Sequence, residues 1–195
     1  MQQADIAIDF HGPFKIGGNN GSILFSNQVS RHSGIYLFTV QYNDGYLVYY
    51  VGETGKSFFE RIKEHAIHYF GGNYRVYDPK AFKNAQKTLI WQGMWQRDTK
   101  DRMPIYIDKC HALVPIIRDF LKLLDIFVAP FEAETRLRRR IEGAFARHLR
   151  QQPPPIGNFQ DDDIRYIQRK RDETPIHVRI SCSHKLHGMP STLLA

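Results

Sequence analysis

Residues 34–65 read GIYLFTVQYNDGYLVYYVGETGKSFFERIKEH, and this stretch decides the fold. It contains two runs rich in β-branched and aromatic residues, IYLFTVQY and YLVYYVG, which are typical of strands. Between them stand Asn43, Asp44 and Gly45, the residue types that tolerate the positive φ angles of a hairpin turn. The segment therefore predicts an antiparallel hairpin.

A helix is predicted directly after the hairpin, from about Ser57 to Phe70. Ser57 and Glu60 have the spacing of a capping box, and apolar residues then recur at helical spacing until two glycines end the run. Arg61 and His65 lie four residues apart on this helix, so both side chains leave one face. One site can therefore use both.

Two tyrosines of the hairpin, Tyr36 and Tyr50, can point to the same sheet face, because side chains alternate along each strand. Tyrosine is also a common strand former, so in isolation these two residues would have a structural role. The order strand, strand, helix gathers the tyrosines, Arg61 and His65 where the sheet meets the helix.

The rest of the chain is less regular. The first 30 residues hold short apolar pieces and predict an irregular or short-stranded extension. Residues 124–130, LDIFVAP, predict a buried strand, and a second long helix runs from about Glu132 to the prolines at 153–155. Between the two helices, short strands or ordered loops are expected, including PIYID at 104–108, with a helix beginning at Pro115. In the tail, PIHVRIS at 175–181 alternates as a strand does.

Composition limits the class of protein. A chain of 195 residues with 42% hydrophobic residues can bury one core, and 27 Lys and Arg against 20 Asp and Glu give a net charge of +7. This charge favours an acidic partner, nucleic acid before an anionic membrane. Two cysteines are too few for a disulfide framework, and no apolar run reaches the length of a membrane span. A soluble protein of the cytoplasm is expected.

Two residues of the second half complete a set of groups suited to phosphodiester hydrolysis. Glu142 lies at the edge of the apolar face of the second helix, where a carboxylate can be partly desolvated and aimed at a cation. Asn158 follows the proline run, and a loop could return its amide to the same place. A carboxylate can hold Mg²⁺, an arginine can stabilise phosphoryl charge, and a phenol or imidazole can accept the proton of an attacking water.

These motifs resemble the GIY-YIG nuclease family. The resemblance rests on GIY at 34–36, YVG at 50–52, Arg61 and His65 on the following helix, and the segment DIFVAPFEAETRLRRRIEGAFARHLRQQPPPIGN at 125–158. It covers roughly residues 33–70 and 124–158. The resemblance implies a stand-alone, restriction-like or repair-type endonuclease that hydrolyses DNA and uses Mg²⁺ or Mn²⁺.

The resemblance also implies a role for each matched residue. Tyr36 would be the general base, with Tyr50 as its hydrogen-bonding partner, and Arg61 would contact the scissile phosphate. His65 would orient or relay the proton, and Glu142 would be the sole protein carboxylate on the metal. Asn158 would brace the site.

The family pattern implies a mixed α/β (α+β) fold with a small antiparallel three-stranded sheet flanked by helices. In this interpretation residues 1–32 form an N-terminal extension, 33–158 the nuclease core and 159–195 a C-terminal extension. The separation of His65 from Glu142 is large for the family, so residues 71–123 would be an insertion. For the same reason, Glu132 or Glu134 stays an alternative metal ligand.

Basic residues are the candidate contacts to DNA. We expect backbone contacts from Lys56, Arg61, Arg138, Arg139, Arg169 and Arg171, although arginines on an exposed helix are often only solvated charge. Trp91 and Trp95 are expected in the core of the insertion, and a base-stacking surface is the alternative.

Two other functions stay open: a catalytically silent DNA- or RNA-binding module with the same fold, and a nuclease directed at RNA. The sequence does not determine the oligomeric state. A dimer is one option, because its symmetry would suit paired cleavage of a palindrome.

Overall fold

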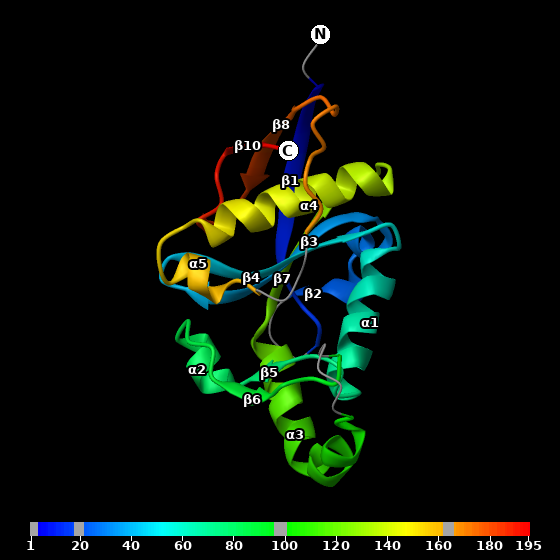
Figure 1. Cartoon of the computed structure of the whole chain (residues 1–195), viewed down its shortest axis with the longest axis vertical. Helices are drawn as coiled ribbons and strands as arrows, with labels where there is room; N and C mark the ends of the chain where they lie inside the picture. Colours follow the sequence, from blue (N-terminus) through cyan, green and yellow to red (C-terminus); the bar gives the residue numbers. More distant parts are fainter. Residues whose placement is uncertain (1–3, 18–21, 96–100, 162–165) are drawn as a thin grey trace.

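A long mixed sheet organises the chain in the computed structural model, which describes residues 4–17, 22–95, 101–161 and 166–195 (Figure 1). The strand order is β10–β8–β1–β7–β3–β4–β9, with β2 paired to β1. Most neighbours are antiparallel, whereas β1 runs parallel to β8 and to β2, and β4 runs parallel to β9. The described part of the chain is thus a mixed α/β fold, as predicted.

The elements have the following bounds. The strands are β1 (Ala4–Lys15), β2 (Ser22–Ile23), β3 (Gly34–Tyr42), β4 (Gly45–Thr54), β5 (Val76–Tyr77), β6 (Leu89–Trp91), β7 (Asp125–Pro130), β8 (Ile176–Cys182), β9 (Leu186–His187) and β10 (Thr192–Leu194). The helices are α1 (Phe58–Phe70), α2 (Pro79–Lys83), α3 (Met103–Leu123), α4 (Thr135–Arg150) and α5 (Ile156–Phe159), with 3-10 turns at Leu24–Ser26 and Gln28–Arg31.

The centre of the sheet confirms the hairpin and the third strand. β3 pairs with β4 and with β7, antiparallel in both cases, and Asn43 takes the positive φ that the turn requires. The predicted capping box is present, because Ser57 accepts from the Glu60 amide while the Glu60 carboxylate accepts from the Ser57 amide. Local sequence signals were sufficient for these elements.

The prediction of a small three-stranded sheet was wrong, because both ends of the chain add strands. Residues 4–15 do not form an irregular extension: β1 lies between β7 and β8 and alternates buried Ile8 and Phe10 with exposed Asp9. Gly12 and Pro13 usually end a strand, and here the register shifts near them while the strand continues. Side-chain burial against the neighbouring strands outweighs the two weak strand formers.

The segment between α1 and β7 also differs from the prediction. PIYID at 104–108 is helical, and α3 contains Pro115 instead of beginning at it. Pro104 stands in the first turn, where a missing amide costs nothing. The burial of Ile117 and Phe120 on one face of α3 offsets the hydrogen bond that Pro115 cannot make.

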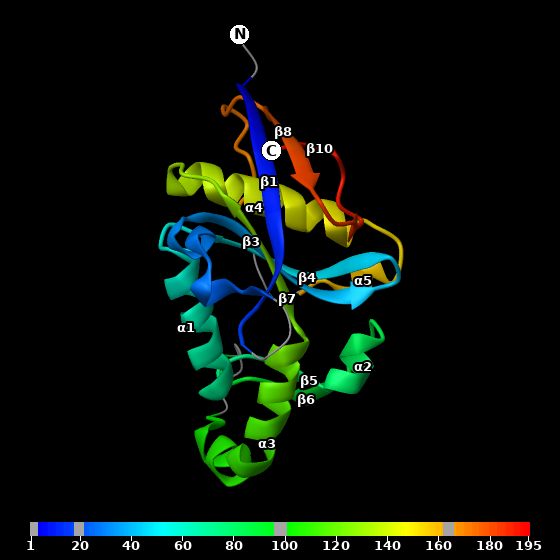
Figure 2. The ribbon, with the colours of Figure 1, turned by 180° about the vertical axis from the view of Figure 1, so that it is seen from behind.

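The two faces of the sheet carry separate cores. Ile35 and Leu37 of β3 pack in the core that includes Ile141 and Phe145 of α4. Tyr36 and neighbouring side chains of β3 face the other way, into the core that α1 and α3 help to build. Figures 1 and 2 show α4 on one side of the strands and α1 and α3 on the other. Within the described ranges, no helix combines the length and the apolar character that crossing a membrane requires.

One buried ion pair joins β1 to β7. Lys15 Nζ lies 2.8 Å from Asp125 Oδ1, and the Asp125 side chain is almost fully buried. Burial raises the pKa of this carboxyl, and Lys15 opposes that shift.

We expect Lys15→Met to lower the free energy of unfolding by about 3 kcal/mol, because it leaves the Asp125 carboxylate buried without its partner. Urea unfolding followed by circular dichroism measures this change. The double variant Lys15→Met with Asp125→Leu should recover most of the loss, and an equally unstable double variant would contradict the interpretation.

Candidate active site

Three polar side chains meet on the α1 face of the sheet. The Tyr36 hydroxyl oxygen lies 2.7 Å from His65 Nε2, and Arg61 Nε donates to the same oxygen at 3.1 Å. Tyr36 comes from β3, while Arg61 and His65 come from α1, one turn apart. Since Arg61 has no acceptor, the simplest arrangement has Tyr36 receiving its hydrogen bond and donating to His65.

Tyr50 joins this group because of an irregularity in the hairpin. The register between β3 and β4 shifts after the Phe38–Tyr50 pair, so that Tyr49 is an extra residue in β4. Tyr49 and Tyr50 consequently both pack on the α1 face. The rings of Tyr36 and Tyr50 lie 5.9 Å apart between centroids, which confirms that they share one face.

Gly52 makes room for the Tyr36 ring. It stands directly opposite Tyr36 in the β3–β4 register, and a Cβ atom at this position would lie 2.3 Å from Tyr36 Cζ. The Tyr36 side chain is 0% exposed, so it has no open space into which it could move. The glycine of the YVG motif is therefore required by the close approach of the tyrosine.

Burial controls the protonation of this cluster. It raises the pKa of Tyr36 to about 12, against the opposing effect of the Arg61 charge. It also holds the pKa of His65 well below its usual range, and Arg61 acts in the same direction. At neutral pH the phenol is thus protonated and the imidazole is neutral, which suits a hydrogen bond from Tyr36 to His65.

Glu142 reaches the cluster around the free edge of β4. Its Oε1 accepts the backbone amide of Glu53 at 3.1 Å, at the edge where the Tyr166 hydroxyl donates to the Val51 carbonyl. Burial, followed by the negative charge of Glu53, raises the pKa of Glu142 to about 7. Charge interactions link Glu142 to Tyr36, Tyr50 and Arg61. Of the predicted residues, Tyr36, Tyr50, Arg61 and His65 thus form one cluster, and Glu142 lies at the neighbouring strand edge, where its charge acts on them.

Asn158 does not join them. It is exposed on α5, and within the described ranges its side chain makes no hydrogen bond. The expected bracing role is therefore not supported by its position. The chain turns after the prolines so that Phe159 is buried instead, and Gln160 donates to the Val48 carbonyl. The alternative ligands Glu132 and Glu134 are also exposed, at the start of α4.

One of the predicted DNA contacts, Arg138, is buried, whereas Arg139, Lys56, Arg169 and Arg171 are exposed. Arg138 is buried and pairs with Glu53, with Nε to Oε2 at 2.9 Å, so it supports the site rather than facing a ligand. Arg139, half exposed, pairs with the same carboxylate at 3.2 Å. Lys56 is exposed and contacts Glu64.

The other predicted DNA contacts outside the cluster, Arg169 and Arg171, are both exposed in the segment before β8.

Glu53 is a site residue that the sequence interpretation missed. Its amide binds Glu142, and its carboxylate holds Arg138 and Arg139, so it connects β4 to α4. A signal existed, since Glu53 follows directly on YVG. Strand alternation, however, places it on the face opposite Tyr36, and only the packing of α4 on that face brings Glu142 to it.

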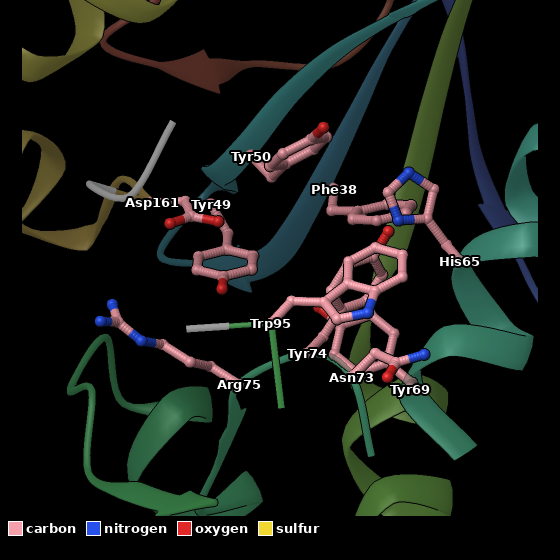
Figure 3. Close-up of a pocket in the computed structure, with 10 residues that line it drawn as sticks. All are labelled: Phe38, Tyr49, Tyr50, His65, Tyr69, Asn73, Tyr74, Arg75, Trp95 and Asp161. Atoms are coloured by element: carbon pink, nitrogen blue, oxygen red, sulfur yellow. The ribbon is translucent and has the colours of Figure 1, made fainter. Parts of the chain in front are cut away.

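A pocket of about 350 Å³ adjoins the cluster (Figure 3). Tyr50 and His65 line it from the sheet and α1, and Tyr74 and Trp95 line it from the segment between α1 and α3. The prediction that both tryptophans belong to the core was right for Trp91, which is 6% exposed, and wrong for Trp95, which is 59% exposed.

Glu142 is the residue that would bind a divalent metal ion at this site. Among the residues that the structure describes, no three His, Cys, Asp or Glu side chains gather closely enough to hold an ion. A Mg²⁺ ion bound by one carboxylate, water and phosphate oxygens does not need such a group. Within the same ranges only Oε1 of Glu142 accepts a hydrogen bond and the residue forms no ion pair, so this half-buried carboxylate fits a bound cation.

Comparisons with known proteins found no matching family model, no similar curated protein and no similar solved structure.

We expect Gly52→Ala to displace the Tyr36 ring and to destabilise the fold by about 1–3 kcal/mol, as overpacking of a buried site does. Chemical denaturation measures the loss, and the Tyr36–His65 contact can be followed through the imidazole resonances by NMR. Gly17→Ala is the matched control, because a Cβ atom there meets nothing within 4 Å. Equal stability of the Gly52 and Gly17 variants would contradict the packing argument.

The pKa of Glu142 predicts a pH dependence of stability in EDTA. Because the folded pKa of about 7 exceeds the ordinary value of 4.5, the folded state keeps a proton that the unfolded state has lost. The native protein should therefore lose stability relative to Glu142→Gln as pH rises from about 4.5 to 7, by on the order of 2–3 kcal/mol. Denaturant unfolding at several pH values measures this difference. A constant difference across the window would contradict the raised pKa.

Proposed function

We propose that this protein is a Mg²⁺- or Mn²⁺-dependent endonuclease of the GIY-YIG type that hydrolyses phosphodiester bonds in DNA. The observation that carries the proposal is the meeting of Tyr36, Arg61 and His65 beside Glu142, a half-buried carboxylate that forms no ion pair within the described ranges. The net charge of +7 supports a polyanionic substrate. A cytoplasmic enzyme with free Cys110 and Cys182 fits this function.

Arg61 has two tasks in this proposal. In the free protein its guanidinium covers the Tyr36 hydroxyl, and it also contacts Glu64 at 3.4 Å. A scissile phosphate would draw the guanidinium toward its own oxygens, where the positive charge stabilises the transition state. The same movement would uncover Tyr36, so that substrate binding and access of water to the phenol would be coupled.

Tyr36 and His65 would move the proton. The neutral imidazole accepts the hydrogen bond from Tyr36, so it can take the phenolic proton as the phenol oxygen takes a proton from the attacking water. The chain needs this relay because the pKa of Tyr36, about 12, is too high for a free phenolate at neutral pH.

Glu142 would hold the cation, with Glu53 orienting its carboxylate through the backbone amide. When bound, Mg²⁺ would supply positive charge to the phosphate and the leaving oxygen. Arg138 and Arg139 would act indirectly, by fixing Glu53, and Arg169, Arg171 and Lys56 stay as candidate contacts to the DNA backbone.

The test is nicking and linearisation of supercoiled plasmid with Mg²⁺. We expect Glu142→Gln to cut about 100-fold more slowly or worse, because loss of a metal ligand should cost at least as much as loss of its supporting partners. Glu134→Gln, a matched carboxylate on the exposed start of α4, should cut like the native protein, and EDTA should abolish cutting.

Unchanged cutting by Glu142→Gln, or an equal loss in the Glu134 variant, would overturn the assignment of the metal ligand. Tight DNA binding without cutting by the native protein would favour the catalytically silent module. Cutting confined to RNA would identify the other alternative.

A further inference from the structure

The pocket beside the candidate site is built from two parts of the chain. Phe38, Tyr50 and His65 line it from the sheet and α1, and Asn73, Tyr74 and Trp95 line it from the segment after α1 (Figure 3). Tyr50 and His65 also contact Tyr36, with ring centroids 5.9 and 5.6 Å away. A molecule in this pocket would thus lie one side chain away from the proposed general base.

We infer that this pocket receives one unstacked nucleobase of the substrate strand, adjacent to the phosphate that is cut. The inference rests on the proposed nuclease function and adds to it a class of substrate: strands with unpaired bases. Four observations lead to it, namely the size of the pocket, its aromatic walls, its polar groups and the exposure of Trp95.

The volume suits a single ring system with its sugar. About 350 Å³ lies near the lower end of the roughly 300–1,000 Å³ typical of small-molecule sites. A stacked base pair would not enter a space of this size between two walls. A base would have to leave its stack, which costs least when it is already unpaired.

The walls offer flat apolar surfaces. Tyr74 lies 5.5 Å from His65 and 5.5 Å from Trp95, measured between ring centroids, so three rings follow one another along the pocket. Bases of any sequence stack on such rings, because every base presents a π face. This arrangement fits a base better than an aliphatic ligand.

The polar groups are those that recognise base edges. Asn73 supplies an amide, whose Nδ2 lies 3.1 Å from His68 Nδ1, and Arg75 and Asp161 supply a guanidinium and a carboxylate. Amide, guanidinium and carboxylate groups all pair with the donors and acceptors of bases. The pocket is therefore lined by both aromatic rings and polar groups, as sites for flipped bases are.

Trp95 lines the pocket while most of its side chain stays exposed. It is 59% exposed, although its ring lies only 4.4 Å from that of His68. Exposed tryptophan is costly to leave in water, and its position on a pocket wall points to a ligand that covers it. Substitution of Trp95 should therefore change binding without unfolding the protein.

The experiment compares two small probes in EDTA, so that no cutting occurs. Deoxyadenosine 5′-monophosphate carries the base, and deoxyribose 5-phosphate lacks it. NMR titration of the ¹⁵N-labelled full chain measures both affinities and locates the resonances that shift. We expect the native protein to bind the nucleotide about 5-fold or more tightly than the abasic probe, with shifts at residues 73–75.

Variants then connect the preference to the pocket. Trp95→Ala should abolish the preference, and Trp95→Phe should restore most of it. Ile107→Ala should behave like the native protein, because Ile107 is 62% exposed on α3 and does not line the pocket. Equal binding of the two probes, or an unchanged preference in Trp95→Ala, would overturn the inference.

The two proposals can fail separately. If the native protein cuts plasmid but shows no preference for the base, only the pocket inference is wrong. If it prefers the base through Trp95 but cuts neither single-stranded nor supercoiled DNA, the nuclease proposal is wrong and the pocket is a nucleotide site of another kind.

Discussion

The contact of the Tyr36 ring with Gly52 across the β3–β4 hairpin is the constraint on which the site depends. A buried ring can lie flat over a neighbouring strand only where that strand has no side chain, and Gly52 provides that position. The ring then presents its hydroxyl to α1, where Arg61 and His65 meet it. The Tyr36 hydroxyl oxygen thus connects α1 to the β3–β4 pair, and its burial also sets the protonation state of the phenol.

The site also depends on two interruptions of regular β structure. The extra residue in β4 brings Tyr49 and Tyr50 to the same face, and bulges next to functional sites commonly re-aim side chains in this way. The outer edge of β4 is paired with β9 only at Tyr46 and Leu47. Beyond them, Glu142 and Tyr166 bind the strand edge instead, which both protects it and brings a carboxylate beside the tyrosines.

Burial determines the chemistry as much as the residue types do. The same desolvation that keeps Tyr36 protonated keeps His65 neutral and raises the pKa of Glu142. Each shift alone would be an electrostatic cost to the fold. Together they describe a site that favours an added positive charge beside Glu142, and the proposed function assigns that role to a divalent cation and a phosphate held by Arg61.

Local patterns were reliable where a few adjacent residues determine the structure. The turn residues of the hairpin, the capping box of α1 and the spacing of Arg61 and His65 all depend on short-range geometry, and all were predictable. The prediction was wrong where tertiary packing outweighed a local signal. Pro115 lies within α3, and β1 continues past Gly12 and Pro13, because burial of neighbouring apolar side chains offsets the local cost.

Charged and amide residues were the hardest to place, because their roles depend on partners far away in the chain. Arg138 has the sequence context of a solvated arginine, yet it is buried against Glu53. Asn158 stands where a bracing amide was expected, yet it is exposed. The opposite errors share one cause: helical spacing tells which face a residue occupies but not what lies against that face.

The sequence by itself determined the hairpin, the helices α1 and α4 and the residue types that could meet between them, since periodicity and turn chemistry are local properties. Only the tertiary structure decided that Tyr36, Arg61 and His65 meet beside Glu142, that Glu53 holds this carboxylate, and that Trp95 lines a pocket instead of a core. These outcomes depend on how distant segments pack, because desolvation and hydrogen-bond geometry arise only when the segments come together.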